Sequence, residues 1–184
     1  MAQLLNNHLI LDFSHVYCDE NIPRNDKIHW IDCSDIYECD LYCSQSAEEE
    51  IHRRIDPYGI GGIHFLDSGN YHYVTKIMTD RISEPFSLIL FDHHTDMQPP
   101  LIDGMNSCGD WARSVLLTNP NLQQLVLIGP KKADIQAVFT DKQLKAREKK
   151  MLKEKLIAFP AEELRAGEGH EKAEKIRMDV PFYI

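Results

Sequence analysis

The sequence lacks any apolar run of about 18 residues or more, so it contains no candidate membrane-spanning helix. Its first residues also lack a basic region followed by a long apolar one, so we expect no secretory signal. Internal repeats, low-complexity tracts and domain linkers are absent too. Together these absences predict a cytoplasmic protein that makes no contact with membranes.

Positive charge is in short supply, because 20 lysines and arginines stand against 29 aspartates and glutamates, a formal net charge of −9. Such an excess of negative charge argues against binding nucleic acid. The lysine-rich stretch 141–155 does not change this, because glutamates are interspersed in it and aromatic residues are not. It is typical of a solvated helix face. The glycines of 59–62 do not form a phosphate loop, because they precede a strand and no Lys-Ser/Thr follows them.

Cysteines are few and odd in number, five in all, and four of them fall in the first quarter of the chain. Cys39 and Cys43 have the separation of two zinc ligands, but no second cysteine or histidine pair completes a tetrahedral set at the usual spacing. We therefore interpret the cysteines as reduced thiols of a cytosolic protein.

The length of 184 residues predicts one domain with a sizeable core, and 43% apolar and 27% charged residues are ordinary for a globular protein. Apolar runs alternate with amphipathic segments, which predicts an α/β fold of three layers, a mainly parallel sheet with helices on both faces. The expected strands are 8–13, 27–31, 63–66, 87–91, 124–130, 155–160 and 180–184, and the expected helices are 46–55 (capped by Ser46), 71–82, 108–117 and one from 161.

Three potential metal ligands, Asp92, His94 and Asp96, follow the apolar run 87–91 at alternate positions. The carboxyl end of a strand is where α/β sheets place their sites. If the chain stays extended there, the three side chains point to one side. Carboxylate and imidazole ligands suit Mn²⁺, Fe²⁺ or Zn²⁺. The alternative is a charged turn with exposed histidines, which explains an aspartate but not the alternating pattern.

Two further histidines are weaker candidates. His93 would point away from Asp92 and His94 on an extended segment, which favours a supporting or packed role over ligation. His64 lies inside an expected strand, so we expect it to belong to the core or to a sheet face.

The stretch 92–96 resembles the D-x-H-x-D metal motif of the ureohydrolase (arginase/agmatinase) superfamily. Twenty residues earlier, the stretch 67–72 follows another apolar strand and resembles the family's glycine-rich loop, which opens a helix and carries a histidine ligand. The resemblance covers roughly residues 60–130. It implies an arginase-like fold and a hydrolase of C–N bonds, which acts on a small cationic (guanidinium or amidine) or amide substrate through a metal-activated hydroxide.

The resemblance also implies a cofactor and its ligands. The complete family site holds two Mn²⁺ ions, and the matching residues here are His72, Asp92, His94 and Asp96. By resemblance, Asp92 bridges the ions, Asp96 and His72 complete one coordination sphere, and His94 belongs to the other. Two adjacent ions lower the pKa of a shared water and stabilise the charge that develops during attack.

One loop departs from the family. Where the family usually has a His-Gly pair beside the substrate, this chain has Cys108 and Asp110, which are our candidate catalytic residues. A cysteine replaces imidazole poorly near neutral pH unless its pKa is depressed. Asp110 either anchors a cationic substrate or caps the helix that begins there. This departure leaves arginase activity itself open.

The expected last strand, 180–184, resembles the strand that runs into the family's second motif, S-x-D-x-D, and the chain stops there. We therefore expect residues 1–184 to be a single arginase-like domain that is incomplete at its C-terminus and inactive alone. Bound metal should be weak or absent in this form. A sheet edge left without its next strand favours self-association, so a homo-oligomer is a further expectation.

Two alternatives stay open. Residues 91–94 also match the Asp-His-His motif of DHH phosphoesterases, which are metal-dependent. That family needs an upstream D-x-D motif and a later glycine-rich histidine motif, and neither is found, since Asp12 stands alone in its strand. The other alternative is a non-catalytic α/β module. Replacing Asp96 by alanine separates the ureohydrolase hypothesis from the DHH hypothesis, because the DHH pattern does not require that position.

Overall fold

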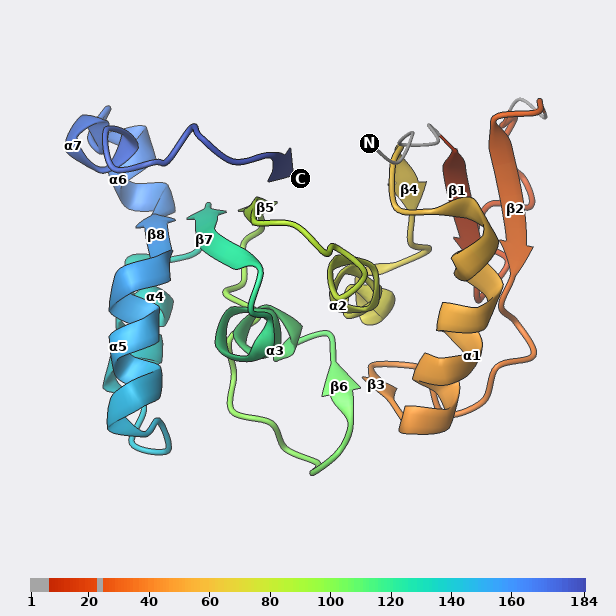
Figure 1. Cartoon of the computed structure of the whole chain (residues 1–184), viewed down its shortest axis with the longest axis horizontal. Helices are drawn as coiled ribbons and strands as arrows, with labels where there is room; N and C mark the ends of the chain where they lie inside the picture. The colour runs from red at the N-terminus through yellow and green to blue at the C-terminus, as the bar shows by residue number, and fades with distance from the viewer. Residues whose placement is uncertain (1–6, 23–24) are drawn as a thin grey trace. The chain divides into compact units, whose positions relative to one another are not determined.

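The computed structural model describes residues 7–22 and 25–184 (Figure 1). Its contacts group the chain into two compact units. Unit 1 comprises Met1–Arg81 and Pro100–Cys108, and unit 2 comprises Ile82–Pro99 and Gly109–Ile184. The two are described separately below, and a single arginase-like domain over 1–184 stays a prediction.

Unit 1 contains a parallel sheet of three strands in the order β2-β1-β4. Its strands are β1 (His8–Asp12), β2 (Ile28–Asp32) and β4 (His64–Phe65). Asp12 pairs with Asp32 in register, so both carboxylates lie at the carboxyl edge of this sheet. A second, antiparallel pair joins β3 (Tyr42–Cys43) to β6 (Asn106–Ser107).

The helices of unit 1 begin with α1 (Gln45–Ile55). Its cap is Ser44, whose Oγ accepts from the backbone N–H of Ala47 at 3.3 Å, and not the predicted Ser46. Ser44 is the last residue with extended backbone, and for this reason its hydroxyl reaches the first free N–H groups. The 3₁₀ turns η1 (Asp56–Tyr58) and η2 (Gly69–Tyr71) and the helix α2 (Val74–Thr79) follow.

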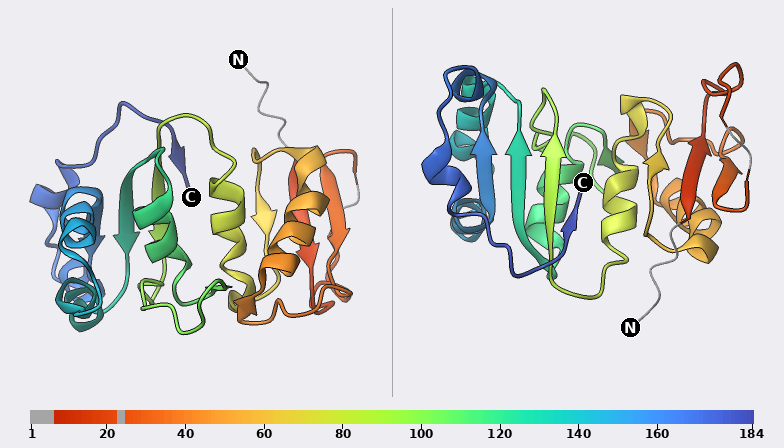
Figure 2. Two further views of the ribbon diagram at one scale, coloured as in Figure 1. Left: turned by 60° about the horizontal axis from the view of Figure 1, so that its bottom comes forward. Right: turned by 90° about the horizontal axis from the view of Figure 1, so that it is seen from above.

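Unit 2 contains a parallel sheet of four strands in the order β8-β7-β5-β9, drawn side by side in Figure 2. Its strands are β5 (Phe86–Phe91), β7 (Leu122–Ile128), β8 (Leu156–Phe159) and β9 (Phe182–Tyr183). Its helices are α3 (Trp111–Thr118), α4 (Lys132–Thr140), α5 (Ala146–Lys155), α6 (Ala161–Arg165) and α7 (His170–Ala173). The buried side chains of β5, β7 and α3 make up most of its core.

A network of buried hydrogen bonds attaches the segment before β9 to the central strands of this sheet. The Gln124 amide, 3% exposed, donates to Ser87 Oγ at 2.9 Å and to the Arg177 carbonyl at 2.7 Å. Its oxygen accepts from the Arg177 N–H at 2.9 Å. The Ser87 N–H in turn donates to the carbonyl of Pro181. These bonds hold the segment before β9 against β5 and β7.

The α/β class with mostly parallel strands is confirmed. The described strands form three hydrogen-bonded sheets instead of the one expected sheet, since β4 has only two residues and bonds to β1 alone. Helix α4 is not predicted, because only Ile135 and Val138 of its residues are buried, which is too weak an apolar pattern.

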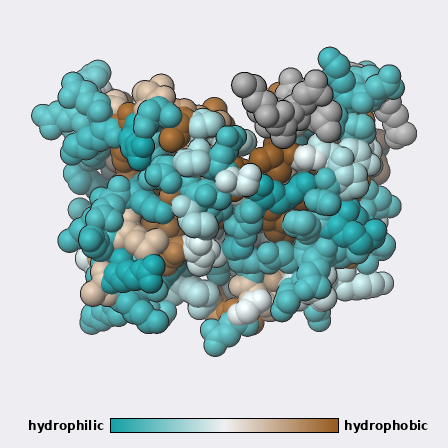
Figure 3. Space-filling view, in the orientation of Figure 1, coloured by the Kyte–Doolittle hydropathy of each residue, from teal (hydrophilic) through white to brown (hydrophobic). Residues whose placement is uncertain are grey.

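Helix α5, which holds the lysine-rich stretch, buries only Leu152, as expected for a solvated helix face. The face drawn in Figure 3 is mostly hydrophilic. Within the described residues, every helix is too short or too polar to cross a bilayer.

Candidate metal centre at the end of β5

The D-x-H-x-D stretch directly follows β5, an internal strand of the unit 2 sheet. The Asp92 N–H donates to the Ile128 carbonyl at 3.0 Å, so ladder bonding to β7 continues one residue past Phe91. Gly129, at φ +113°, follows at the same level, and a Cβ built on it would lie 2.7 Å from the Asp92 carbonyl oxygen. The backbone of Asp92 is therefore held by its hydrogen bond to β7 and packs closely against Gly129.

We expect Gly129→Ala to destabilise the protein by about 2–5 kcal/mol. Positive φ with a Cβ costs roughly 1–2 kcal/mol, and the clash with the Asp92 backbone adds roughly 1–3 kcal/mol. Gly167→Ala is the matched control in the same unit, because Gly167 also has positive φ (+71°) but no atom within 4 Å of its built Cβ. Urea denaturation measures both, and equal losses would show that the approach to Asp92 carries no energy.

Beyond Asp92 the chain turns and does not stay extended. The His94 N–H donates to Asp92 Oδ1 at 2.8 Å, which closes a tight turn over 92–94. Asp96 then adopts a left-handed backbone with φ +48°. The expectation that alternate side chains share one side because of an extended backbone is therefore wrong, since the Asp92 side chain competes for a backbone N–H of its own segment.

The turn nevertheless brings the two carboxylates together. An oxygen of Asp92 lies within 4.8 Å of an oxygen of Asp96. Asp96 is 6% exposed, and its Oδ2 accepts from Nε1 of Trp111 at 2.7 Å. Its carbonyl accepts from the N–H groups of Ala112 and Arg113 at 3.1 and 3.2 Å. Asp96 is thus fixed from both its side chain and its backbone by the first turn of α3.

The structure does not enclose His94 with this pair. The His94 side chain is 82% exposed, and its Nδ1 lies 3.4 Å from Asp92 Oδ1. His93 is exposed as well. The carboxylates of Asp92 and Asp96 therefore lie close together. The imidazole of His94 stays at the surface, near Asp92.

The other two candidate histidines, His72 and His64, belong to unit 1. His72 is half-buried at the end of η2, where its N–H donates to the Gly69 carbonyl at 3.2 Å and its carbonyl accepts from Thr75. Its ligand role stays a prediction. His64 is half-buried in β4, and its Nε2 contacts the Ile60 carbonyl at 3.1 Å, which makes Nε2 the protonated nitrogen. Burial lowers the pKa of His64, so it is neutral and structural, as expected.

The two candidate catalytic residues lie in the segment just before helix α3. Cys108 is half-buried, and its N–H donates to the Leu41 carbonyl at 3.0 Å beside the β3–β6 pair. Asp110 occupies the N-cap position of α3 and is 6% exposed, but its side chain makes no capping hydrogen bond. The N-cap position agrees with one of the two alternatives for Asp110, but the capping hydrogen bond is not formed.

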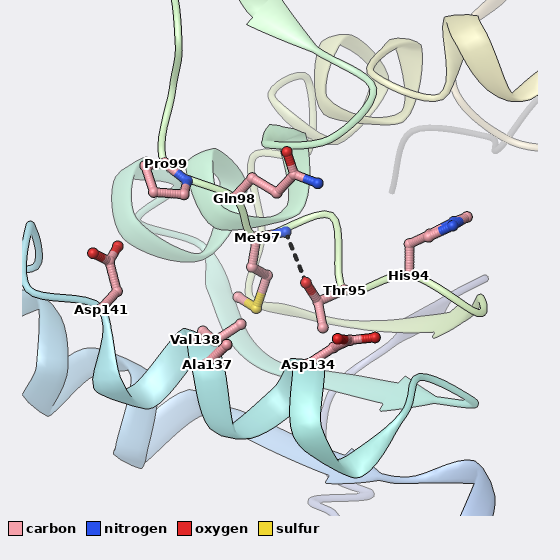
Figure 4. Close-up of a pocket in the computed structure, with 9 residues that line it drawn as sticks. All are labelled: His94, Thr95, Met97, Gln98, Pro99, Asp134, Ala137, Val138 and Asp141. Atoms are coloured by element: carbon pink, nitrogen blue, oxygen red, sulfur yellow. Dashed lines mark hydrogen bonds between the residues drawn. The ribbon is translucent and has the colours of Figure 1, made fainter.

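A cavity of about 500 Å³ lies within unit 2, between the loop after His94 and helix α4 (Figure 4). Met97 and Val138 form an apolar wall, and Asp134 and Asp141 add carboxylates. The Gln143 N–H and the Arg113 guanidinium, 2.6 Å away, hold the pKa of Asp141 below its usual range. Asp134 is exposed, so this cavity offers an open carboxylate to a small cation. Sequence reasoning missed it along with α4.

Comparison with known proteins gives little. No family model matches the chain, and no solved structure matches it. An uncharacterised protein of Thermotoga maritima is 31% identical over 79 residues, which cover 42% of this chain and 31% of that protein. The chain therefore spans about a third of the length of this curated relative.

Proposed function

We propose that this chain forms part of a metal-dependent hydrolase of C–N bonds, similar to the ureohydrolase superfamily and sharing its arginase-like fold. One observation carries the proposal: Asp92 and Asp96 place carboxylate oxygens within 4.8 Å of each other just past the end of a central parallel strand. Ligand sites of α/β sheets lie at this end of the strands.

The donor set fits a divalent cation. Two carboxylates this close repel each other, and a cation between them offsets that repulsion. Oxygen ligands favour Mn²⁺ or a similar hard ion, and the resemblance adds His72 and His94 to the proposed ligands. When bound, the metal supplies Lewis-acid activation of water near neutral pH.

The remaining steps belong to side chains of the protein. Trp111 keeps Asp96 oriented, as outer partners of metal ligands do, and the turn at 92–94 orients Asp92. The open carboxylate of Asp134 attracts a small cationic substrate to the cavity. The leaving nitrogen needs a proton, and we propose Cys108 or Asp110 as its source.

The proposal is tested on the complete protein loaded with Mn²⁺, assayed against arginine, agmatine, formiminoglutamate, guanidinobutyrate and acetylated polyamines. We expect release of urea, formamide or acetate, and at least a ~100-fold loss with Asp96→Ala, because a ligand and the partner of Trp111 disappear together. Gln123→Ala, a half-buried change on β7, is the control and should retain activity.

Two outcomes would contradict the proposal. Phosphodiester cleavage that survives Asp96→Ala would indicate a DHH phosphoesterase instead. If no substrate gave a product and the complete protein bound no metal, the result would indicate a non-catalytic α/β module.

A further inference from the structure

At the carboxyl end of β1, unit 1 gathers three different metal-binding side chains. Asp12, His15 and Cys18 place one oxygen, one nitrogen and one sulfur within 4.8 Å of one another. We propose that these residues form a zinc site that stabilises the loop after β1. The proposal is independent of C–N bond hydrolysis and shares no ligand with Asp92 and Asp96.

The Asp12 carboxylate is the observation that points to a ligand. It is 3% exposed, and its Oδ2 contacts His15 Nδ1 at 3.1 Å and accepts from Trp30 Nε1 at 3.1 Å. Its Oδ1 is fully buried, and no hydrogen-bond donor reaches it among the described residues. A buried carboxylate oxygen without a partner is costly. A cation bound through Oδ2 neutralises the buried carboxylate and so lowers the cost of leaving Oδ1 without a donor.

The separation of two of the three ligand atoms is close to that in a small tetrahedral site. With zinc bonds of about 2.0–2.1 Å to O or N and about 2.3 Å to S, neighbouring ligand atoms lie roughly 3.3–3.6 Å apart. The separation of Asp12 Oδ2 and His15 Nδ1, 3.1 Å, is close to this value. Cys18 needs only a small movement, because it is exposed and its atoms already lie within 4.8 Å of the others.

Asp67, which follows β4, holds the loop that carries His15 and Cys18. The Asp67 carboxylate accepts from the N–H groups of Phe13 and Ser14 at 3.0 and 2.8 Å. The Asp67 N–H donates to the Tyr17 hydroxyl at 2.6 Å. His15 itself has a left-handed backbone, φ +62°, which turns the loop back toward Asp12. The backbone of the loop is therefore held near Asp12 before any ion binds, and the Cys18 side chain is the ligand that has to move.

The ligand types select the metal. A thiolate with an imidazole and a carboxylate favours zinc over harder ions such as Mn²⁺, and three protein ligands leave a fourth position for water. Neighbouring cysteines do not compete, because burial raises the pKa of Cys33 and of Cys43 to about 12 and keeps them protonated. Cys18 is the exposed thiol of the chain.

The test titrates Co²⁺, a spectroscopic substitute for zinc, into the 184-residue chain. We expect a near-ultraviolet band from charge transfer between thiolate and Co²⁺, which stoichiometric Zn²⁺ then displaces. Cys18→Ser should abolish the band, and His15→Asn should weaken binding at least about tenfold. Asparagine tolerates the positive φ of this position, so the second variant removes the imidazole without straining the loop.

Two controls locate the site. Cys108→Ser, which removes the half-buried thiol, should keep the band. The double variant Asp92→Asn, Asp96→Asn should keep it too, so failure of the proposed hydrolase site leaves this result unaffected. The proposal is overturned if the wild-type chain gives no thiolate band, if the band survives Cys18→Ser, or if zinc leaves the alkylation rate of Cys18 unchanged.

Discussion

Asp92→Asn is expected to lower divalent metal bound at the proposed site at the end of β5 by at least about tenfold in the complete protein, and to abolish the proposed C–N bond hydrolysis with it. The amide removes the negative charge that holds the cation but keeps an oxygen that accepts from the His94 N–H, so the turn survives. Metal content after equilibrium dialysis against Mn²⁺ measures the loss.

Asp92→Ala separates the two roles of this side chain. It removes both the charge and the acceptor for the His94 N–H, so we expect the same metal loss and a further destabilisation of about 0.5–1.5 kcal/mol. Urea denaturation of both variants without metal gives that difference. If Asp92→Asn retained the metal content of the wild type, Asp92 would not be a ligand.

Trp111→Ala is expected to cost about 3–5 kcal/mol of stability, the largest loss that we predict for a single residue. The indole is completely buried at the start of α3 and donates to Asp96 Oδ2 at 2.7 Å. Its loss therefore leaves a cavity and a buried carboxylate without this donor. Chemical denaturation of the 184-residue chain measures the change.

Trp111→Phe is the matched variant, since it fills most of the space but donates no hydrogen bond. We expect a smaller cost of about 1–3 kcal/mol and weaker metal binding by the complete protein, because Asp96 loses the group that orients it. Asp96→Asn combined with Trp111→Phe should be less destabilising than the sum of the two. Additive effects would show that the indole and the carboxylate act independently.

The parallel strands were predictable because burial on both faces leaves an unbroken apolar run in the sequence. This holds best for β7, where Leu125 to Leu127 are buried without alternation. In β5, Leu88 and Leu90 are buried on one face, whereas Ile89 on the other face is half-buried. The residue types at the end of β5 were equally visible. Sequence therefore indicated the sheet and the place where Asp92 emerges from it.

The direction of each candidate ligand was not predictable. It depends on the hydrogen bond from the His94 N–H to the Asp92 side chain and on the left-handed backbone of Asp96. The hydrophobic periodicity of the sequence predicts neither of these features. Asp12, His15 and Cys18 are also visible as every third residue. What brings them together is again a left-handed backbone, at His15.

The attachment of β9 by Gln124 has a consequence for the order of folding. Strand β5 lies between β7 and β9, yet β9 is separated from it by most of unit 2 in the sequence. Pairing of distant segments is slow, because a long loop must close before any contact forms. During synthesis one edge of β5 therefore stays unpaired until the last residues of unit 2 leave the ribosome. Until then the Ser87 N–H lacks the Pro181 carbonyl, and the Gln124 amide lacks the backbone of Arg177. That interval is when a chaperone or a second nascent chain has access to this edge.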